Sequence, residues 1–198
     1  PALEGGNISC GTGGIPGAVC KVYEKSEGIV FKTICDKELS GICGSGLIDL
    51  ISLMLNRHIL DETGSLDSEN FRLCGIHEMK DMSAVFEPPK STSILITQKD
   101  IRELQLAKSA IRAGIETLAF EAGIPLDSIS KVYIAGGMGF YMDTSNAVRI
   151  GMLDYISGSM DEPHELAGAG SCTLCGDSCT YPKSPCRYPK RARRSMEA

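Results

Sequence analysis

The chain has 198 residues, a formal net charge of -5 at pH 7, and 42% hydrophobic and 23% charged residues. These values are typical of one globular domain with an appendage, and they exclude an intrinsically disordered protein. The sequence contains neither an apolar run of the roughly 20 residues that cross a bilayer nor a secretory signal at its start. We therefore expect a cytoplasmic protein without a membrane partner. Because the first residue is Pro rather than Met, we also expect a piece of a longer polypeptide.

The nine cysteines are distributed unevenly along the chain. Five stand singly, often in apolar surroundings, and four lie close together near the C-terminus. A secreted disulfide scaffold is usually smaller and richer in loops. The distribution therefore indicates a reducing compartment, with the clustered cysteines reserved for a metal.

The first predicted elements are a loop and a β-hairpin. Residues 1–16 are rich in glycine and lack hydrophobic periodicity, which predicts a loop. Residues 18–24 and 29–34 alternate apolar and polar side chains and are rich in β-branched residues. Because a turn sequence at residues 26–28 separates them, the two segments predict a hairpin.

A glycine turn then opens a predicted helix. Gly44, Ser45 and Gly46 precede apolar residues at helical spacing. This pattern ends near Arg57 and His58, cations that suit a helix C-terminus. In the mixed region that follows, we expect short strands at residues 71–74 and 84–87.

The strongest helix signal begins at Thr97. Its hydroxyl can cap the helix, and Asp100 three residues later is close to a capping box. Apolar residues then recur every three to four positions and predict one buried stripe, formed by Ile101, Leu104, Ala107, Ile111, Ile115 and Leu118. Gly123 and Pro125 end the helix.

A second glycine turn follows the long helix. Residues 131–135 predict a short strand that leads into Gly136, Gly137 and Gly139, and residues 145–151 predict a short helix. Glycines between a strand and a helix allow backbone N–H groups to approach a phosphate or nucleotide closely. Each of the two glycine turns, taken singly, is also explained as a plain structural turn. We place a domain boundary near residue 165, which gives domains at 1–165 and 166–198.

Five phrases of the sequence resemble one known family, the C-terminal domain of the reductive activators of corrinoid proteins. The phrases lie within residues 1–155, at 1–11, 41–49, 95–105, 107–114 and 133–137. The family belongs to the superfamily of actin, sugar kinases and chaperone ATPases. The resemblance implies an α/β fold of the layered ribonuclease-H type, which binds ATP with magnesium between two such halves. It also implies ATP-dependent electron transfer that returns a corrinoid cofactor from Co(II) to Co(I) for methyl transfer.

The resemblance further implies which residues lie near the nucleotide. Gly136, Gly137 and Gly139 correspond to the turn on the adenosine side, and the helix start at Gly44, Ser45 and Gly46 has a similar form. Lys108 and Arg112 would flank the nucleotide from the long helix. The implied partner is a corrinoid protein or a corrinoid-dependent methyltransferase, while the electron donor stays open and a homodimer is one alternative.

The sequence departs from this family and superfamily in two respects. The superfamily's phosphate loops have an Asp-x-Gly-Thr pattern, which does not occur in this sequence. The [2Fe–2S] domain that precedes many activators does not occur in it either. ATP hydrolysis needs a phosphate cradle and a carboxylate-assisted magnesium ion. We therefore expect ATPase activity only in a longer protein and assign no catalytic residue.

The cysteine-rich segment predicts a metal site. Its ligands would be Cys172, Cys175, Cys179 and Cys186, with two, three and six residues between successive cysteines. Four thiolates in such a stretch suit a [4Fe–4S] cluster, with zinc as the alternative metal. The remaining alternative is that the four cysteines are free thiols that bind no metal. Residues 170–198 also resemble a group of small predicted metal-binding proteins, and we expect that match to be truncated at Ala198.

Two other functions stay open at this point. Six basic residues between Lys183 and Arg194 could make a zinc-stapled tail that contacts an acidic partner or nucleic acid. Nucleic acid is disfavoured because Tyr188 is the one aromatic residue among them. A small-molecule kinase of the same superfamily is the other alternative.

Overall fold

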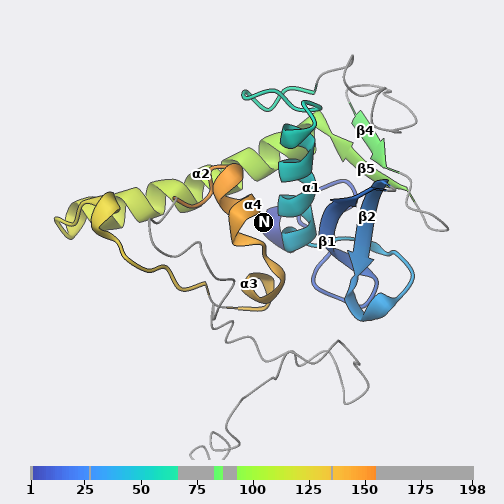
Figure 1. Ribbon diagram of the computed structural model, residues 1–198, viewed down its shortest axis with the longest axis horizontal. Coiled ribbons are helices and arrows are strands. Elements are labelled where there is room, and N and C mark those ends of the chain that lie inside the picture. Colours follow the sequence, from blue (N-terminus) through green and yellow to red (C-terminus); the bar gives the residue numbers. More distant parts are fainter. Residues whose placement is uncertain (1, 27, 67–82, 87–92, 135, 155–198) are drawn as a thin grey trace, which may run out of the picture.

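The computed structural model describes residues 2–26, 28–66, 83–86, 93–134 and 136–154 (Figure 1). The predicted hairpin is confirmed: β1 (Ala18–Lys25) and β2 (Gly28–Thr33) pair antiparallel. A two-residue strand, β3 (Gly41–Ile42), pairs parallel with β1 on its other side. The result is a mixed sheet in the order β2-β1-β3. Two short 3-10 helices, η1 (Ala2–Glu4) and η2 (Ile34–Asp36), lie before and after the hairpin.

Helix α1 (Gly44–Asn56) is the centre of the core and confirms the first predicted helix. Nearly all of its residues are buried, on every side of the helix, which is expected of a helix enclosed by its neighbours rather than lying on a surface. Its N-terminal part packs on β1, whose Ala18, Val19 and Cys20 are also buried. In Figure 1, α1 stands between the hairpin and the later helices.

A second, two-stranded sheet consists of β4 (Ser83–Phe86) and β5 (Ile94–Thr97), paired antiparallel. Strand β4 confirms the predicted strand as far as Phe86, whereas Glu87 and the strand predicted at residues 71–74 lie outside the described residues. Our sequence analysis missed β5. Its alternation of buried Ile94 and Ile96 with exposed Leu95 is the strand pattern of period two.

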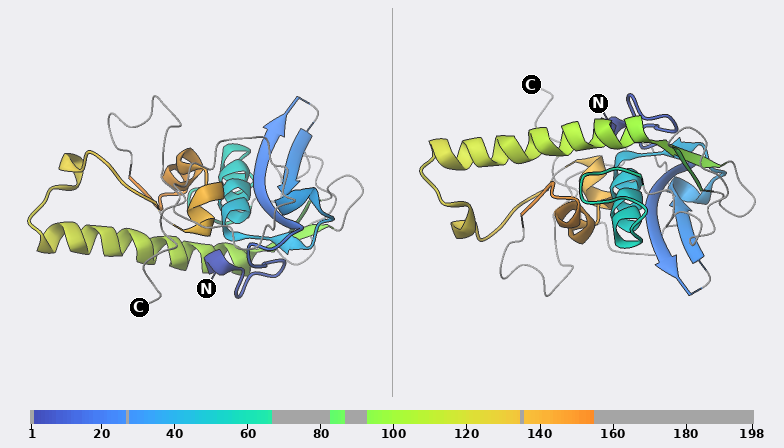
Figure 2. Two further views of the ribbon diagram at one scale, coloured as in Figure 1. Left: turned by 90° about the horizontal axis from the view of Figure 1, so that it is seen from below. Right: turned by 90° about the horizontal axis from the view of Figure 1, so that it is seen from above.

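Helix α2 (Gln98–Glu121) begins with the predicted capping box. The Asp100 N–H donates to Thr97 Oγ1 (3.1 Å), and the Thr97 N–H donates to Asp100 Oδ2 (2.8 Å). The predicted buried stripe is wrong at its C-terminal end, because Leu104 is buried whereas Leu118 is 73% exposed. The reason is that the second half of α2 projects beyond the rest of the domain (Figure 2). The helix ends where predicted, followed by Gly123 at φ 65°.

The strand predicted at residues 131–135 is also wrong over its described part. Residues 131–134 are extended but belong to no strand, and Ala135 lies outside the described residues. Val132 and Ile134 are half-buried while Lys131 and Tyr133 are exposed, as in a strand with one covered face. The segment lies on the side of α1 away from both described sheets, so neither sheet supplies a partner (Figure 1).

Two short helices complete the described chain and lie beside α1. These are α3 (Gly137–Tyr141) and α4 (Thr144–Arg149), and α4 confirms the helix predicted near the end of the domain. The hydrophobic core extends from the hairpin through α1 to α4, where Ala147 and Ile150 are buried. The predicted α/β class is thus confirmed, while the boundary near residue 165 lies outside the described residues. Among the described helices, none is both long and apolar enough to cross a membrane.

Candidate functional site

The glycine turn at the start of α1 is closed by the protein itself. Gly44, Ser45 and Gly46 are all buried, and Ser45 Oγ donates to the Cys20 carbonyl oxygen (2.9 Å). A Cβ added to Gly46 would lie 2.3 Å from the Val19 carbonyl oxygen, and real Cβ atoms do not approach backbone so closely. At Gly44, an added Cβ would lie 2.1 Å from the Leu3 carbonyl oxygen. These glycines are therefore required by the contact of α1 with β1 and η1.

The glycine turn at the start of α3 is open. Gly136 has φ 98° and ψ 170°, a conformation that favours glycine. A Cβ added to Gly136 or Gly137 would meet no described atom within 4 Å, and Gly137 is exposed. Packing within the described chain thus does not require a glycine at 137. The backbone here can be approached closely from outside.

The fold brings the two glycine turns together. A Cβ added to Gly44 would lie 3.1 Å from Met138 Sδ, so α3 rests on the first residue of α1. Gly139 is buried, and its own added Cβ would lie 2.7 Å from Ile134 Cγ2. The turn at the start of α1 therefore supports the turn at the start of α3. The two turns are about ninety positions apart, and their contact was not predicted from the sequence.

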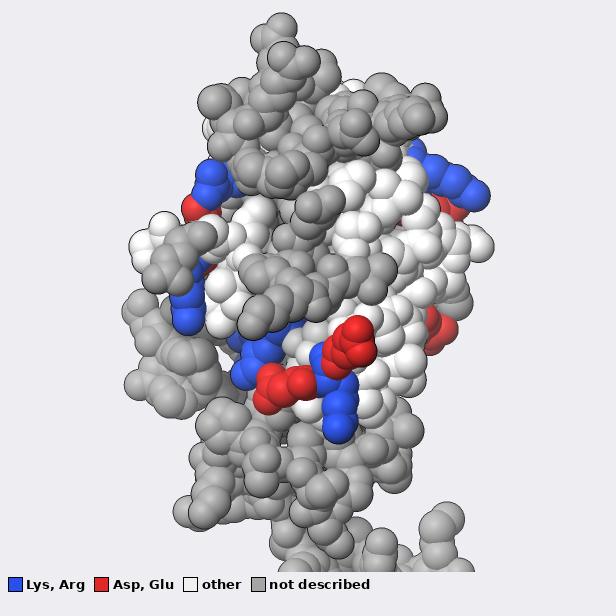
Figure 3. All heavy atoms as spheres, turned by 90° about the vertical axis from the view of Figure 1, so that its right-hand side faces the viewer, with Lys and Arg blue, Asp and Glu red and all other residues white. Residues whose placement is uncertain are grey.

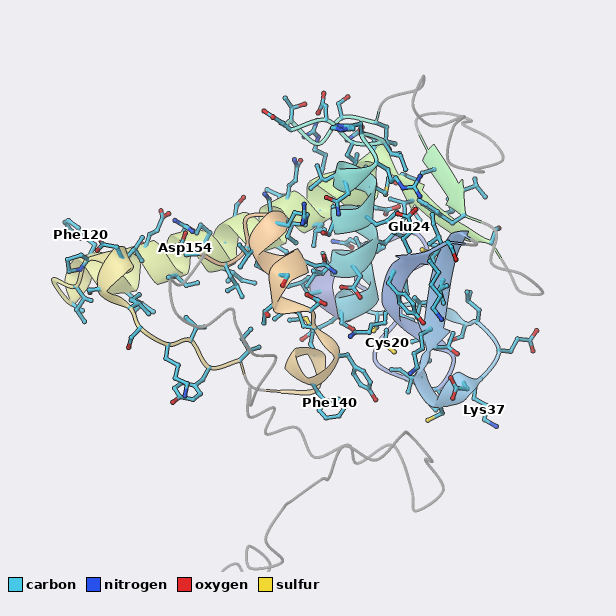
Figure 4. All side chains as sticks on the ribbon, viewed as in Figure 1. Cys20, Glu24, Lys37, Phe120, Phe140 and Asp154 are labelled. Atoms are coloured by element: carbon cyan, nitrogen blue, oxygen red, sulfur yellow. The ribbon has the colours of Figure 1, made fainter. Side chains whose placement is uncertain are left out.

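Lys108 and Arg112 make contacts with the segment that follows α4. Lys108 Nζ donates to the Ile150 carbonyl oxygen (2.5 Å). The Arg112 guanidinium binds the carboxylates of Glu116 and Asp154, of which Asp154 is labelled in Figure 4. Both cations thus have partners within the chain and tie α2 to residues 150–154. Their proposed place beside a nucleotide stays a prediction.

A buried polar group that the sequence analysis missed lies on α1. Asp49 is 2% exposed, and burial raises the pKa of its carboxyl to about 6, against the opposing effect of a hydrogen bond from Asn146. Asn146 Nδ2 donates to Asp49 Oδ1 (2.7 Å), and Ser52 Oγ donates to Asn146 Oδ1 (2.8 Å). A pocket of about 290 Å³ beside this group is lined by Lys21, Val22, Tyr23, Asp49, Asp143 and Asn146. An acidic residue inside the apolar run 47–51 was the available signal.

The predicted metal ligands Cys172, Cys175, Cys179 and Cys186 lie outside the described residues. Within the described ranges, no group of three or more His, Cys, Asp or Glu side chains could hold a metal ion. Cys43, the N-cap of α1, is buried with its Sγ 3.3 Å from Ser45 Oγ. Its place is that of a small core residue.

The described residues on the face that carries the hairpin include both basic and acidic side chains (Figure 3). Figure 3 shows basic and acidic side chains interspersed on the described residues of this face. A nucleic-acid-binding surface usually has a basic patch or stripe. The basic residues between Lys183 and Arg194, on which the nucleic-acid alternative was based, lie outside the described residues.

Comparison with known proteins gives consistent matches. The family model of the C-terminal domain of RACo, the ASKHA domain, matches residues 1–188. The corrinoid activation enzyme RamQ of Eubacterium limosum is 33% identical over 171 residues, 80% of this chain and 28% of that protein. The Co(II) methylated amine-specific corrinoid protein reductase of Methanosarcina barkeri is 29% identical over 175 residues, 76% of this chain and 29% of that protein.

A solved structure agrees with the sequence matches. The reductive activator for corrinoid,iron-sulfur protein is similar with a TM-score of 0.69 and 35% sequence identity. The match covers 77% of this chain and 25% of that one. This chain therefore spans less than a third of the length of each of these three proteins.

Proposed function

Because the chain belongs to the family of the C-terminal ASKHA domain of RACo, we propose that it is the C-terminal part of an ATP-dependent reductive activator of corrinoid proteins. The observation that carries the proposal is the family match, which runs from residue 1 to residue 188. Two similar curated proteins, an activation enzyme and a Co(II) corrinoid protein reductase, support it. The proposed reaction is the one-electron reduction of a protein-bound corrinoid from Co(II) to Co(I).

We propose that the open turn at Gly136 and Gly137 contacts the nucleotide. The support is physical: its backbone is approachable, and no described side chain fills the space that a Cβ would take. A bound nucleotide would supply the free energy of hydrolysis for an uphill electron transfer. The chain lacks the Asp-x-Gly-Thr phosphate loop, so the phosphates and magnesium would be held by another part of the polypeptide.

In this proposal, the turn at Gly44, Ser45 and Gly46, here called the packed turn, supports the open turn structurally. Gly44 and Gly46 allow α1 to approach Leu3 and Val19, and Ser45 fastens the helix start to β1 through its hydrogen bond. Together they provide the surface on which α3 rests. Residues of the packed turn would thus act through the fold rather than by touching the nucleotide.

We also propose that Cys172, Cys175, Cys179 and Cys186 bind a [4Fe–4S] cluster that relays electrons, with zinc as the alternative. Four thiolates are a complete ligand set for either, and the family match extends across all four positions. Anaerobic reconstitution with iron and sulfide should give broad visible absorption that a strong reductant bleaches. A colourless protein that retains one zinc per chain would contradict the redox role.

The activity is tested with the full-length protein and a corrinoid protein in the Co(II) state. With a low-potential reductant, the visible spectrum of Co(I) should appear only when ATP and magnesium are added. An ATP analogue that resists hydrolysis serves as the control. Reduction at the same rate without ATP, or no reduction under any of these conditions, would refute the proposal.

A further inference from the structure

Helices α1 and α4 are joined by a seam of polar side chains inside the domain. Asp49 and Ser52 of α1 are buried, with 2% and 1% of their surface exposed. The half-buried Asn146 of α4 bonds to both: its Nδ2 donates to Asp49 Oδ1 (2.7 Å) and its Oδ1 accepts from Ser52 Oγ (2.8 Å). Asp49 Oδ2 also accepts from the Val22 N–H of β1 (3.1 Å). One amide group thus connects α4 to α1, and one carboxylate extends the connection to the sheet.

The seam fixes one relative placement of the two helices. Asp49 lies among fully buried apolar residues such as Ile48 and Leu50, where an apolar side chain would ordinarily stabilise a helix pair at least as well. The two ends of the Asn146 amide differ, since one donates and the other accepts. A slip of α4 by one residue would rotate Asn146 by about 100° and remove the hydrogen bonds that it makes with Asp49 Oδ1 and Ser52 Oγ. These polar groups therefore select one packing arrangement of α4 against α1.

The seam lies next to the element that carries the open glycine turn. Only Met142 and Asp143 separate α3 from α4; Met142 is buried in the core and Asp143 caps α4. On its other side, the turn follows exposed Tyr133 and half-buried Ile134, and α3 itself leaves Phe140 60% exposed (Figure 4). The turn is therefore held on one side by Ile134, which packs against the core, and on the other side by α4.

We infer that Asn146 is a positioning residue for nucleotide binding. By holding α4 against Asp49 and Ser52, it keeps α3 seated on the start of α1. The backbone of Gly136 and Gly137 then stays where it contacts the nucleotide. The inference rests on the proposed function, and it assigns a role in binding to a side chain that lies behind the turn rather than in it.

The first test needs no nucleotide. In the full-length protein, Asn146→Ala removes both ends of the seam, while Ser145→Ala changes its exposed neighbour. Leu60→Ala, a core variant at the opposite end of α1, controls for loss of stability. Hydrogen exchange is followed at the Phe140 and Met142 amides, which donate to the Gly136 and Met138 carbonyl oxygens within α3. Exchange should quicken at least about tenfold in Asn146→Ala, as expected of a local opening, and change little in the two controls.

The second test measures the affinity of the same four proteins for ADP by calorimetry. Asn146→Ala should raise the dissociation constant about tenfold, whereas Ser145→Ala and Leu60→Ala should stay within about twofold of wild type. Unchanged exchange and unchanged affinity in Asn146→Ala would overturn the inference. If the wild-type protein binds no ADP, the proposed function fails, and hydrogen exchange alone then decides whether the seam holds the turn.

Discussion

The two glycine turns look alike in the sequence, yet the structure gives opposite physical reasons for a glycine at each of them. At Gly44 and Gly46, the backbone of another segment occupies the space that a side chain would need. At Gly136 and Gly137, that space holds no atom of the described residues. A glycine-rich turn before a helix therefore has two causes, close packing within the protein and room left for a ligand. The space around each glycine distinguishes these causes, whereas the sequence pattern does not.

The largest expected effect is at the packed turn. In Gly46→Ala, the new Cβ would meet the Val19 backbone at 2.3 Å, and backbone cannot rotate away as a side chain can. We expect a loss of about 3 kcal/mol in the free energy of unfolding, measured by urea denaturation. Gly114→Ala is the matched control, because nothing lies within 4 Å of its added Cβ in the middle of α2. It should stabilise the chain by about 0.5–1 kcal/mol, and equal effects of the two variants would break the comparison.

The next effect concerns Asp49, on the helix that the packed turn begins. Burial raises the pKa of Asp49 from 3.8 to about 6, and Asp143 adds to this while Lys21 opposes it. The folded state therefore binds more protons than the unfolded state between these values, so this contribution to stability is lost as the pH rises from about 4 to about 6. The loss should reach about 2–3 kcal/mol. Denaturation of Asp49→Asn across this range should show a flatter pH dependence; an unchanged slope would mean that another group titrates.

A smaller effect is expected at Gly136, in the open turn. Its φ of 98° is strained for any residue with a Cβ, although no atom of the described chain lies within 4 Å of the added Cβ. Gly136→Ala should therefore cost about 1–2 kcal/mol of unfolding free energy through backbone strain alone. Thermal denaturation with circular dichroism measures this. A loss as large as that of Gly46→Ala would show that the turn is packed after all.

The smallest effect on stability is expected at Gly137. Its backbone is not in the positive-φ region, and an added Cβ would meet none of the described atoms within 4 Å. Gly137→Ala should change the free energy of unfolding by no more than about 0.5 kcal/mol. A clear destabilisation in the same denaturation series would indicate a packing role that the open turn does not have.

Local signals in the sequence predicted much of the fold. Alternation along residues 18–34 predicted the hairpin, and Thr97 with Asp100 predicted the start of α2, because hairpin and cap depend on residues close in the chain. The exposure of Leu118 was missed because periodicity shows which face is apolar but not where the covering layer ends. The segment 131–134 has a strand's alternation but no partner strand among the described residues.

The candidate site was harder to predict than the fold. The pattern of glycines before a helix identified both glycine turns, but their contact through Gly44 and Met138 joins distant parts of the chain. The seam depends likewise on a hydrogen bond between Asp49 and Asn146, which are 97 positions apart. Such pairings arise from tertiary packing. The sequence near either residue does not show which distant residue will be its partner.

The central claim is that the open turn, and not the packed one, contacts the nucleotide. Its most direct test is ADP affinity of the full-length protein, measured by calorimetry for wild type, Gly137→Ala and Gly137→Leu, with Gly114→Ala as control. Filling the open space in steps should raise the dissociation constant progressively, by at least about tenfold for Gly137→Leu, with thermal stability unchanged. Wild-type affinity in Gly137→Leu would contradict the account.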